Sequence, residues 1–146
     1  MDARDKLTVA SESAARPDVA GVERMYETIS SAGVMPGIEE LLGLCHEDVE
    51  MRAYAARAVA AAGAGEHEVL RGRDEIRAFF RDSTEVGFAV SIRARGFEVQ
   101  GDTVLARGSI RVGRPDGSFA ETNVRWSFHF RDGLVDRIGW EQSAGA

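Results

Sequence analysis

Cysteine is almost absent from this chain, which limits how the fold can be stabilised. Cys45 is the only cysteine among 146 residues, so no disulfide can form within the chain. With 44% hydrophobic and 29% charged residues, the composition is that of one globular domain whose core depends on apolar packing. Cys45 continues an apolar face at helical spacing and has no evident histidine partner. We therefore interpret it as a buried helix residue and not as a nucleophile.

The sequence also lacks a long apolar run and an excess of positive charge. No segment approaches the roughly 20 apolar residues that span a bilayer. Residues 1–16 are polar and rich in alanine and serine, without the basic and apolar pattern of a signal peptide. We therefore expect a cytoplasmic protein that does not bind membranes. The net charge of −6 also argues against a nucleic-acid partner.

Three helices are predicted after a disordered tail over residues 1–16, which has few large apolar side chains. The first helix begins at Pro17, which suits a first turn, and ends at Gly33. The second begins near Pro36, and the third, over 73–84, follows a strand-like Val-Leu pair and a glycine N-cap. Their apolar faces contain Val22, Met25, Tyr26 and Ile29, then Ile38, Leu41, Leu42 and Cys45, then Ile76, Phe79 and Phe80.

Alternation of apolar and polar residues predicts five strands. These strands cover residues 48–54, 88–100, 104–112, 120–131 and 134–142. The Asp132-Gly133 pair is typical of a two-residue hairpin turn, and the change of phase at Gly96 predicts a β-bulge. The side chains expected to face inward include Val90, Ile92, Phe97, Val99, Val104, Ala106, Ile110, Val124, Trp126, Phe128, Ile138 and Trp140.

An Ala/Gly-rich stretch at residues 55–66 separates the first strand from the third helix. It fits either a loop or, over 55–62, a short helix, and we favour the loop. A loop of this length could act as a lid over a pocket. Plain disorder at a pocket rim is the alternative.

The element order and several short motifs resemble the nuclear transport factor 2-like fold, and within it the SnoaL-like group. The motifs are Tyr26 with Ala32-Gly33, LCHEDVE at 44–50, LRGRDEI at 70–76 and FHFRDGLV at 128–135. The resemblance implies an α+β cone in which a strongly curved mixed or antiparallel sheet packs on three N-terminal helices. We expect a single domain over 17–143 and a short tail at 144–146. The resemblance implies no single activity, because this fold hosts isomerases, cyclases, epoxide hydrolases, dehydratases and binding modules.

Most catalytic groups of these enzymes are missing from the matching positions. The resemblance places the tyrosine of ketosteroid isomerases at Tyr26, but their general base falls on Ala53 and their acidic hydrogen-bond donor on Trp126. The acidic residue of SnoaL-type cyclases also falls on Trp126. Neither alanine nor an indole can abstract a proton from carbon. Tyr26, His46 and Asp48 are the remaining catalytic candidates, because they supply the residue types of a dehydratase-like site.

The inward side chains instead predict a pocket with an almost wholly apolar wall. Such a wall suits a small, flat, apolar or aromatic molecule that one or two hydrogen bonds hold. The predicted pocket residues are Met25, Tyr26, Tyr54, Phe79, Phe80, Trp126, Phe128, Ile138 and Trp140. We predict no cofactor and no metal, because the histidines lack the spacing of metal ligands.

Three functions stay open from the sequence. The first is binding of a small, mostly apolar ligand without acid–base machinery. The second is an isomerase, cyclase or dehydratase that acts on a polyketide-like or steroid-like substrate. The third is a non-enzymatic dimeric interaction module, because Trp126 and Trp140 are large enough to fill the cone. A buried titratable group would favour the second function, an empty cavity the first, and the absence of a cavity the third.

Basic residues dominate the face of the sheet that is predicted to point outward. They are Arg93, Arg95, Arg107, Arg111, Arg125 and His129. The resemblance implies a homodimer through this sheet face, and arginine suits a polar interface. The alternatives are a simply solvated face, on which Glu98 and Glu121 could pair with the arginines, and the binding of an anionic partner.

Overall fold

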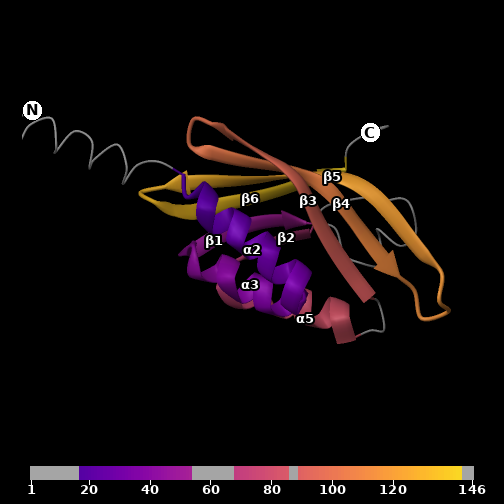
Figure 1. Cartoon of the computed structure of the whole chain (residues 1–146). Helices are drawn as coiled ribbons and strands as arrows, with labels where there is room; N and C mark the ends of the chain where they lie inside the picture. The colour runs from indigo at the N-terminus through magenta and orange to yellow at the C-terminus, as the bar shows by residue number, and fades with distance from the viewer. Residues whose placement is uncertain (1–16, 54–67, 86–88, 143–146) are drawn as a thin grey trace, which may run out of the picture.

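Three helices between residues 19 and 85 pack on a sheet whose long strands lie between residues 89 and 142 (Figure 1). The computed structural model describes residues 17–53, 68–85 and 89–142. Within them the helices are α2 (Val19–Ala32), α3 (Val34–Gly43) and α5 (Arg73–Glu85). The strands are β1 (Cys45–Ala53), β2 (Glu68–Arg71), β3 (Ala89–Gln100), β4 (Thr103–Gly113), β5 (Phe119–Arg131) and β6 (Leu134–Gln142). Tyr54, the 55–66 stretch and the two predicted tails lie outside the described residues.

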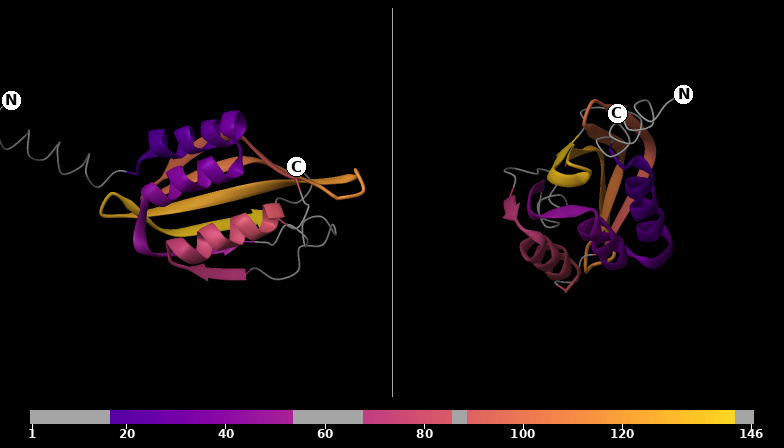
Figure 2. Two further views of the ribbon diagram at one scale, coloured as in Figure 1. Left: turned by 90° about the horizontal axis from the view of Figure 1, so that it is seen from below. Right: turned by 90° about the vertical axis from the view of Figure 1, so that its left-hand side faces the viewer.

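The six strands form one mixed sheet in the order β2-β1-β6-β5-β4-β3. β1 and β6 run parallel, and every other neighbouring pair is antiparallel. The three helices lie against one face of the sheet, which arches over them (Figure 2). The predicted α+β architecture of a curved mixed sheet on three helices is confirmed. None of these three helices is long and apolar enough to pass through a bilayer.

The ends of α2 are determined by local hydrogen bonding and backbone conformation. The Asp18 carboxylate accepts a hydrogen bond from the N–H of Gly21 at 2.9 Å, so the helix begins after Asp18 and not at Pro17. Gly33 ends it with a φ of 107°, a conformation that glycine adopts without a steric cost. The chain turns there and α3 begins at Val34, two residues before the predicted start near Pro36.

Cys45 lies in β1, so its prediction as a helix residue is wrong. Its register partner on β6 is Val135, whose N–H donates to the carbonyl oxygen of Leu44 at 2.8 Å. This parallel pairing ends α3 and directs the chain into the sheet. The prediction used helical spacing alone, and the competing partner lies ninety positions further along the sequence.

The start of α5 is held against β1 by backbone hydrogen bonds. Val69 and Leu70, the strand-like residues before Gly72, belong to β2, which lies antiparallel to β1. Gly72 has a φ of 83°, and its N–H donates to the carbonyl oxygen of Val49 at 2.7 Å. The Glu75 carboxylate in the first turn accepts from the N–H of Arg71 at 2.9 Å, which satisfies a donor at the helix start.

The inward side chains of the long strands form the core as the alternation predicts, with one exception. Trp126 is 4% exposed, so the predicted inward orientation of its ring is confirmed. Val99 pairs with the buried Val104 and so lies on the predicted inward face, but it is 50% exposed. β3 is the edge strand of the sheet, so near its end Val99 has a neighbouring strand on one side only.

The predicted β-bulge at Gly96 is confirmed by a shift of the β3–β4 register between Ala94 and Gly96. Opposite Ala94 on β4 lies Gly108, where a Cβ atom would approach the carbonyl oxygen of Arg93 to 1.9 Å. Only a residue without a side chain permits this approach of the two backbones. Gly108 therefore positions the edge strand β3 against the rest of the sheet.

Gly108→Ala should lower the free energy of unfolding by about 2–3 kcal/mol, because the added methyl group forces the β3 and β4 backbones apart. Urea denaturation followed by circular dichroism measures the change. Gly43→Ala is the matched control, since no atom lies within 4 Å of a Cβ built there. The control should not lower stability, because alanine favours a helix more than glycine does and Gly43 is the last residue of α3. Equal denaturation midpoints for the two variants would contradict the close contact.

Candidate functional site

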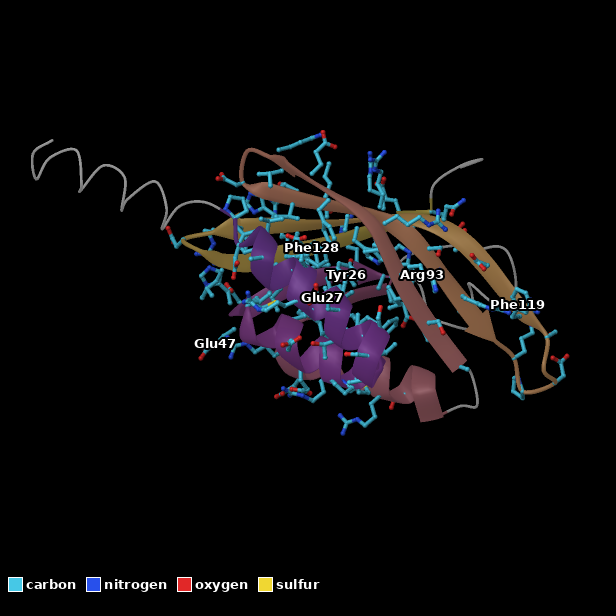
Figure 3. The ribbon with its side chains drawn as sticks, in the orientation of Figure 1. Tyr26, Glu27, Glu47, Arg93, Phe119 and Phe128 are labelled. Atoms are coloured by element: carbon cyan, nitrogen blue, oxygen red, sulfur yellow. The ribbon has the colours of Figure 1, made fainter. Side chains whose placement is uncertain are left out.

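A small hollow lies between the helices and the sheet, and all three described helices contribute to its wall. We call it the Tyr26 cavity, and its volume is about 20 Å³. Figure 3 shows Tyr26 on α2 and Phe128 on β5 in this interior. The lining residues are Met25, Tyr26, Ile29, Ile38, Leu41, Met51, Phe80, Ile92, Trp126, Phe128 and Ile138. Among them Tyr26 alone carries an oxygen atom on its side chain.

Tyr26 is surrounded by aromatic rings. Its ring centroid lies 5.3 Å from that of Trp126, 5.7 Å from Phe97 and 6.1 Å from Phe128. These distances and the tilted or edge-on orientations are favourable for aromatic pairs. The residue is 6% exposed, and burial raises the pKa of its hydroxyl well above the ordinary value. The hydroxyl is therefore a neutral hydrogen-bonding group and cannot act as a phenolate base.

No hydrogen bond joins the Tyr26 hydroxyl to another residue in 17–53, 68–85 or 89–142. A cavity needs about 10–15 Å³ on this measure to hold one water molecule. The Tyr26 cavity is thus large enough for one polar atom beside the hydroxyl, and side chains fill the remaining interior.

Six of the nine predicted pocket residues line the Tyr26 cavity: Met25, Tyr26, Phe80, Trp126, Phe128 and Ile138. Phe79 is half-buried and does not line the cavity. Its ring packs edge-on against that of Phe80, with the ring centroids 5.2 Å apart. Trp140 is buried as the register partner of Trp126 but does not line the cavity. Tyr54 lies outside the described residues.

The sequence analysis missed five lining residues: Ile29, Ile38, Leu41, Met51 and Ile92. Helical spacing and strand alternation had marked all of them except Met51 as core side chains. That signal identifies a buried face but does not distinguish a cavity wall from solid packing.

His46 and Asp48 do not join Tyr26. The Nε2 atom of His46 lies 2.6 Å from the carbonyl oxygen of Arg131, at the β5–β6 hairpin. The Asp48 side chain is 80% exposed, and its Oδ1 lies 3.6 Å from the Arg131 guanidinium. Both side chains connect β1 to that hairpin, and neither lines the cavity. The structure therefore does not form the catalytic set of Tyr26, His46 and Asp48.

No carboxylate replaces the missing catalytic groups within the described lining of the Tyr26 cavity. Ala53 is fully buried, and Trp126 occupies the position at which the resemblance places an acidic group. The Cys45 thiol is buried as well, and burial raises its pKa to about 12 although the nearby Arg73 charge opposes this shift. A thiol that stays protonated at neutral pH is a poor nucleophile.

Comparisons with known proteins agree with the α+β fold described above. A sequence profile of the SnoaL-like domain matches residues 22–138, which is most of the chain. The chain belongs to the SnoaL-like domain family. No curated protein matches the chain significantly.

Solved structures share the fold of this SnoaL-like domain at low sequence identity. A nuclear transport factor 2-like protein of unknown function from Burkholderia pseudomallei is 19% identical over 86% of this chain and 89% of that one, with a TM-score of 0.66. TerC, co-crystallised with polyporic acid, is 21% identical over 86% and 90%, with a TM-score of 0.65. A candidate SnoaL-like polyketide cyclase from a Jannaschia species is 15% identical over 86% and 84%, with a TM-score of 0.61. At these identities the likeness shows the fold alone.

A polar cluster on the other face of the SnoaL-like sheet joins the last two strands. Asp136 on β6 accepts a hydrogen bond from Nδ1 of His129 at 2.6 Å and another from Nε of Arg131 at 3.3 Å. Burial by itself would raise the pKa of Asp136, but the hydrogen bonds and the neighbouring positive charges outweigh burial. The net pKa of Asp136 is lowered, so folding favours its ionised form.

Asp136→Asn should lower the free energy of unfolding by about 1 kcal/mol at pH 7. A carboxylate with a lowered folded-state pKa stabilises the fold above the unfolded pKa of about 3.9, and this contribution disappears as the pH falls through the folded-state value. The difference from the unchanged protein should therefore shrink at pH 3. Urea denaturation at both pH values measures it.

Asp48→Asn provides the matched control, because Asp48 also lies near Arg131 but is exposed. Its effect should stay below about 0.5 kcal/mol at both pH values. A deficit for Asp136→Asn that is the same at pH 3 and pH 7 would show that charge is not the cause.

Proposed function

We propose that this SnoaL-like domain binds a small, mostly apolar molecule at the Tyr26 cavity and supplies no acid–base group to it. The observation that carries this proposal is the Tyr26 hydroxyl, the only side-chain oxygen in an apolar lining, to which no residue in the described ranges hydrogen-bonds. Buried polar groups in folded proteins nearly always have a partner. A ligand oxygen or nitrogen atom beside the hydroxyl would provide that partner.

The present cavity of about 20 Å³ is smaller than an aromatic ligand, so binding requires side chains to move. Met25 and Met51 both line it, and methionine is unbranched and adapts its shape more readily than other apolar residues. Phe80 lies at the same wall on α5. Movement of these three side chains widens the cavity while the stacked Tyr26 and Trp126 rings keep their places.

The similarity to solved structures supports an aromatic or polyketide-like ligand. One relative of the same fold was crystallised with polyporic acid, and two others are candidate polyketide cyclases. Catalysis of cyclisation or isomerisation by this chain has no comparable support. Such chemistry needs a base, and the described lining of the Tyr26 cavity contains no carboxylate or histidine.

A second candidate is an interaction module that binds no small molecule. The observation that favours it is the same volume of about 20 Å³, which leaves little space between the aromatic side chains. The two candidates differ in whether the interior opens for an apolar molecule.

Tyr26→Phe removes the hydroxyl and keeps the ring. Its affinity for phenol should fall about fivefold to tenfold, because one hydrogen bond is worth about 1 kcal/mol. Toluene has the shape of phenol without the hydroxyl and should bind both proteins equally. Chemical-shift titration of the Met25 and Met51 methyl groups measures binding.

The stability of Tyr26→Phe supplies an independent readout. With no protein partner for the hydroxyl, the free energy of unfolding should change by less than about 0.5 kcal/mol. A large loss of stability would reveal an internal hydrogen bond and remove the argument for a ligand. Methyl resonances that do not move in saturating phenol or toluene would favour the filled interaction module.

The homodimer through the outward sheet face stays a prediction. Size-exclusion chromatography with light scattering should give twice the chain mass of 15.8 kDa. A mass of one chain at all concentrations would exclude it.

A further inference from the structure

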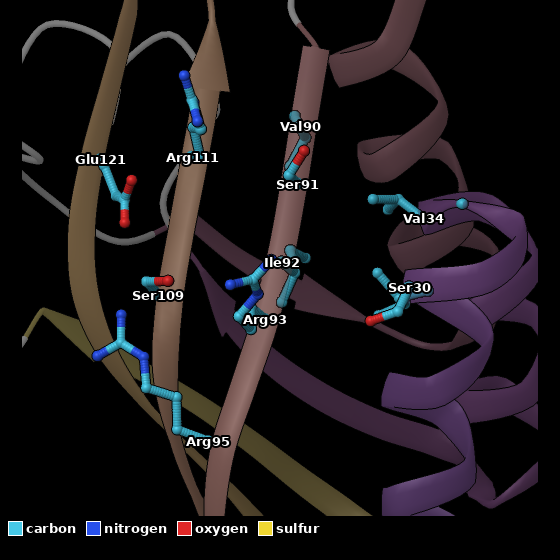
Figure 4. A pocket seen from close by; sticks show the side chains of 12 residues that line it. Ser30, Val34, Val90, Ser91, Ile92, Arg93, Arg95, Ser109, Arg111 and Glu121 are labelled. Carbon is cyan, nitrogen blue, oxygen red and sulfur yellow. The ribbon is translucent and has the colours of Figure 1, made fainter.

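A second and wider hollow runs along the free edge of β3 (Figure 4). Its volume is about 480 Å³, and we call it the β3 groove. One side is apolar and consists of Ile29 and Val34 near the α2–α3 corner with Val90 and Ile92 on β3. The other side consists of outward polar side chains from β3, β4 and β5. A hollow of this size has room for a small organic molecule.

Three arginines on the polar side have no carboxylate partner among the residues that the structure describes. Arg93 and Arg95 lie on β3, and Arg111 lies on β4. In residues 17–53, 68–85 and 89–142, no ion pair forms at any of the three. Arginines elsewhere on the surface do form them, as Arg77 does with Glu39 at 2.6 Å. The groove therefore holds positive charge that the described protein does not neutralise.

Neutral contacts hold two of these arginines in place. The guanidinium of Arg111 lies 3.6 Å from the ring centroid of Phe119, and Nη1 of Arg95 donates to Asn123 at 3.5 Å. Stacking and amide contacts orient a guanidinium without cancelling its charge. Glu121 also lines the groove as the register partner of Arg111, but it forms no ion pair there. Three cations and one anion leave the groove positive in a chain whose net charge is −6.

Ser109 forms the floor between the arginines. It pairs in register with Arg93, and Arg111 follows two residues later on the same face of β4. Arg93 and Arg111 are thus diagonal neighbours with Cβ atoms about 7–8 Å apart, so rotation of the Arg111 side chain away from Phe119 would bring both guanidinium groups to one anion. Ser109 is 7% exposed although it occupies an outward position, because long side chains surround it. Figure 4 shows Ser109 beside Arg93, with Arg111 further along β4.

We propose that the β3 groove binds a small organic anion with an apolar body and a carboxylate group. Arg93 and Arg111 bind the carboxylate with their N–H donors, and the Ser109 hydroxyl donates a further hydrogen bond. The planar guanidinium group matches the geometry of a carboxylate. The apolar body lies across the edge of β3 against Val90 and the α2–α3 corner.

This site is separate from the one under Proposed function. Ile29 and Ile92 line both hollows and form the wall between them. The Tyr26 hydroxyl belongs to the cavity alone, and the arginines belong to the groove alone. Variants of the two sites therefore test the two proposals independently.

Benzoate is the probe, and its neutral analogue benzamide is the matched ligand. Titration of each into the folded protein, followed by amide chemical shifts, should move the Ser91 and Ser109 resonances with benzoate and much less with benzamide. Arg93→Gln and Arg111→Gln should each weaken benzoate binding about fivefold or more. Tyr26→Phe should leave it unchanged. Inorganic phosphate, which lacks an apolar body, should bind more weakly than benzoate.

Arg52→Gln provides the matched charge control, because Arg52 is exposed on β1, which three strands separate from β3. It should change benzoate affinity less than twofold, since distant surface charges are screened by salt. The proposal is overturned if Arg52→Gln weakens binding as much as Arg93→Gln, or if benzamide binds as tightly as benzoate. The proposal is also overturned if saturating benzoate shifts no resonance. This holds even if the reason is a dimer that covers the groove.

Discussion

The packing of Tyr26 against Trp126 is the contact on which the interior of this protein depends. It joins the first described helix to the penultimate strand, two elements far apart in the sequence. Phe97 and Phe128 complete the layer, so α2 cannot move away from the sheet without separating several buried rings. Aromatic pairs of this kind contribute beyond the apolar area that they bury. The layer thus fixes the distance between helix and sheet and, with it, the size of the cavity.

The same layer determines what chemistry the interior permits. An indole stands where enzymes of this fold are expected to hold a carboxyl group, and the neighbouring lining is apolar. Such an interior lowers the polarity around Tyr26 and keeps its hydroxyl protonated. It favours recognition of an apolar shape over proton transfer. Within the described residues, a group of arginines without carboxylate partners lies instead on the outside, along the edge strand β3.

The edge strand β3 combines features that are separate in the sequence. The bulge at Gly96 and the close backbone approach at Gly108 determine how β3 lies on β4. The register that results brings Arg93 beside Ser109 and diagonal to Arg111. An edge strand needs protection from pairing with other chains, and exposed arginines provide it. Their lack of carboxylate partners also leaves them available to an anion.

Local patterns predicted much of this fold because strands and amphipathic helices repeat with short periods. Alternation placed Trp126 and Phe128 inside, and a change of phase located the bulge. Predictions failed where a distant partner overruled the local pattern. Cys45 continued a helical face but pairs with β6, and Val99 alternated correctly but lies on a strand with one neighbour. Neither partner is visible within a short window of sequence.

The sequence by itself determined most of the buried faces, because they follow from residue type and period, and the resemblance to the fold placed alanine and tryptophan at the positions of acidic catalytic groups. Only the tertiary structure decided how much space those buried side chains leave and which arginines lack a carboxylate. Volume and ion pairing depend on distances between atoms of different elements. These distances exist only after helices and strands have packed, so no local pattern in the chain encodes them.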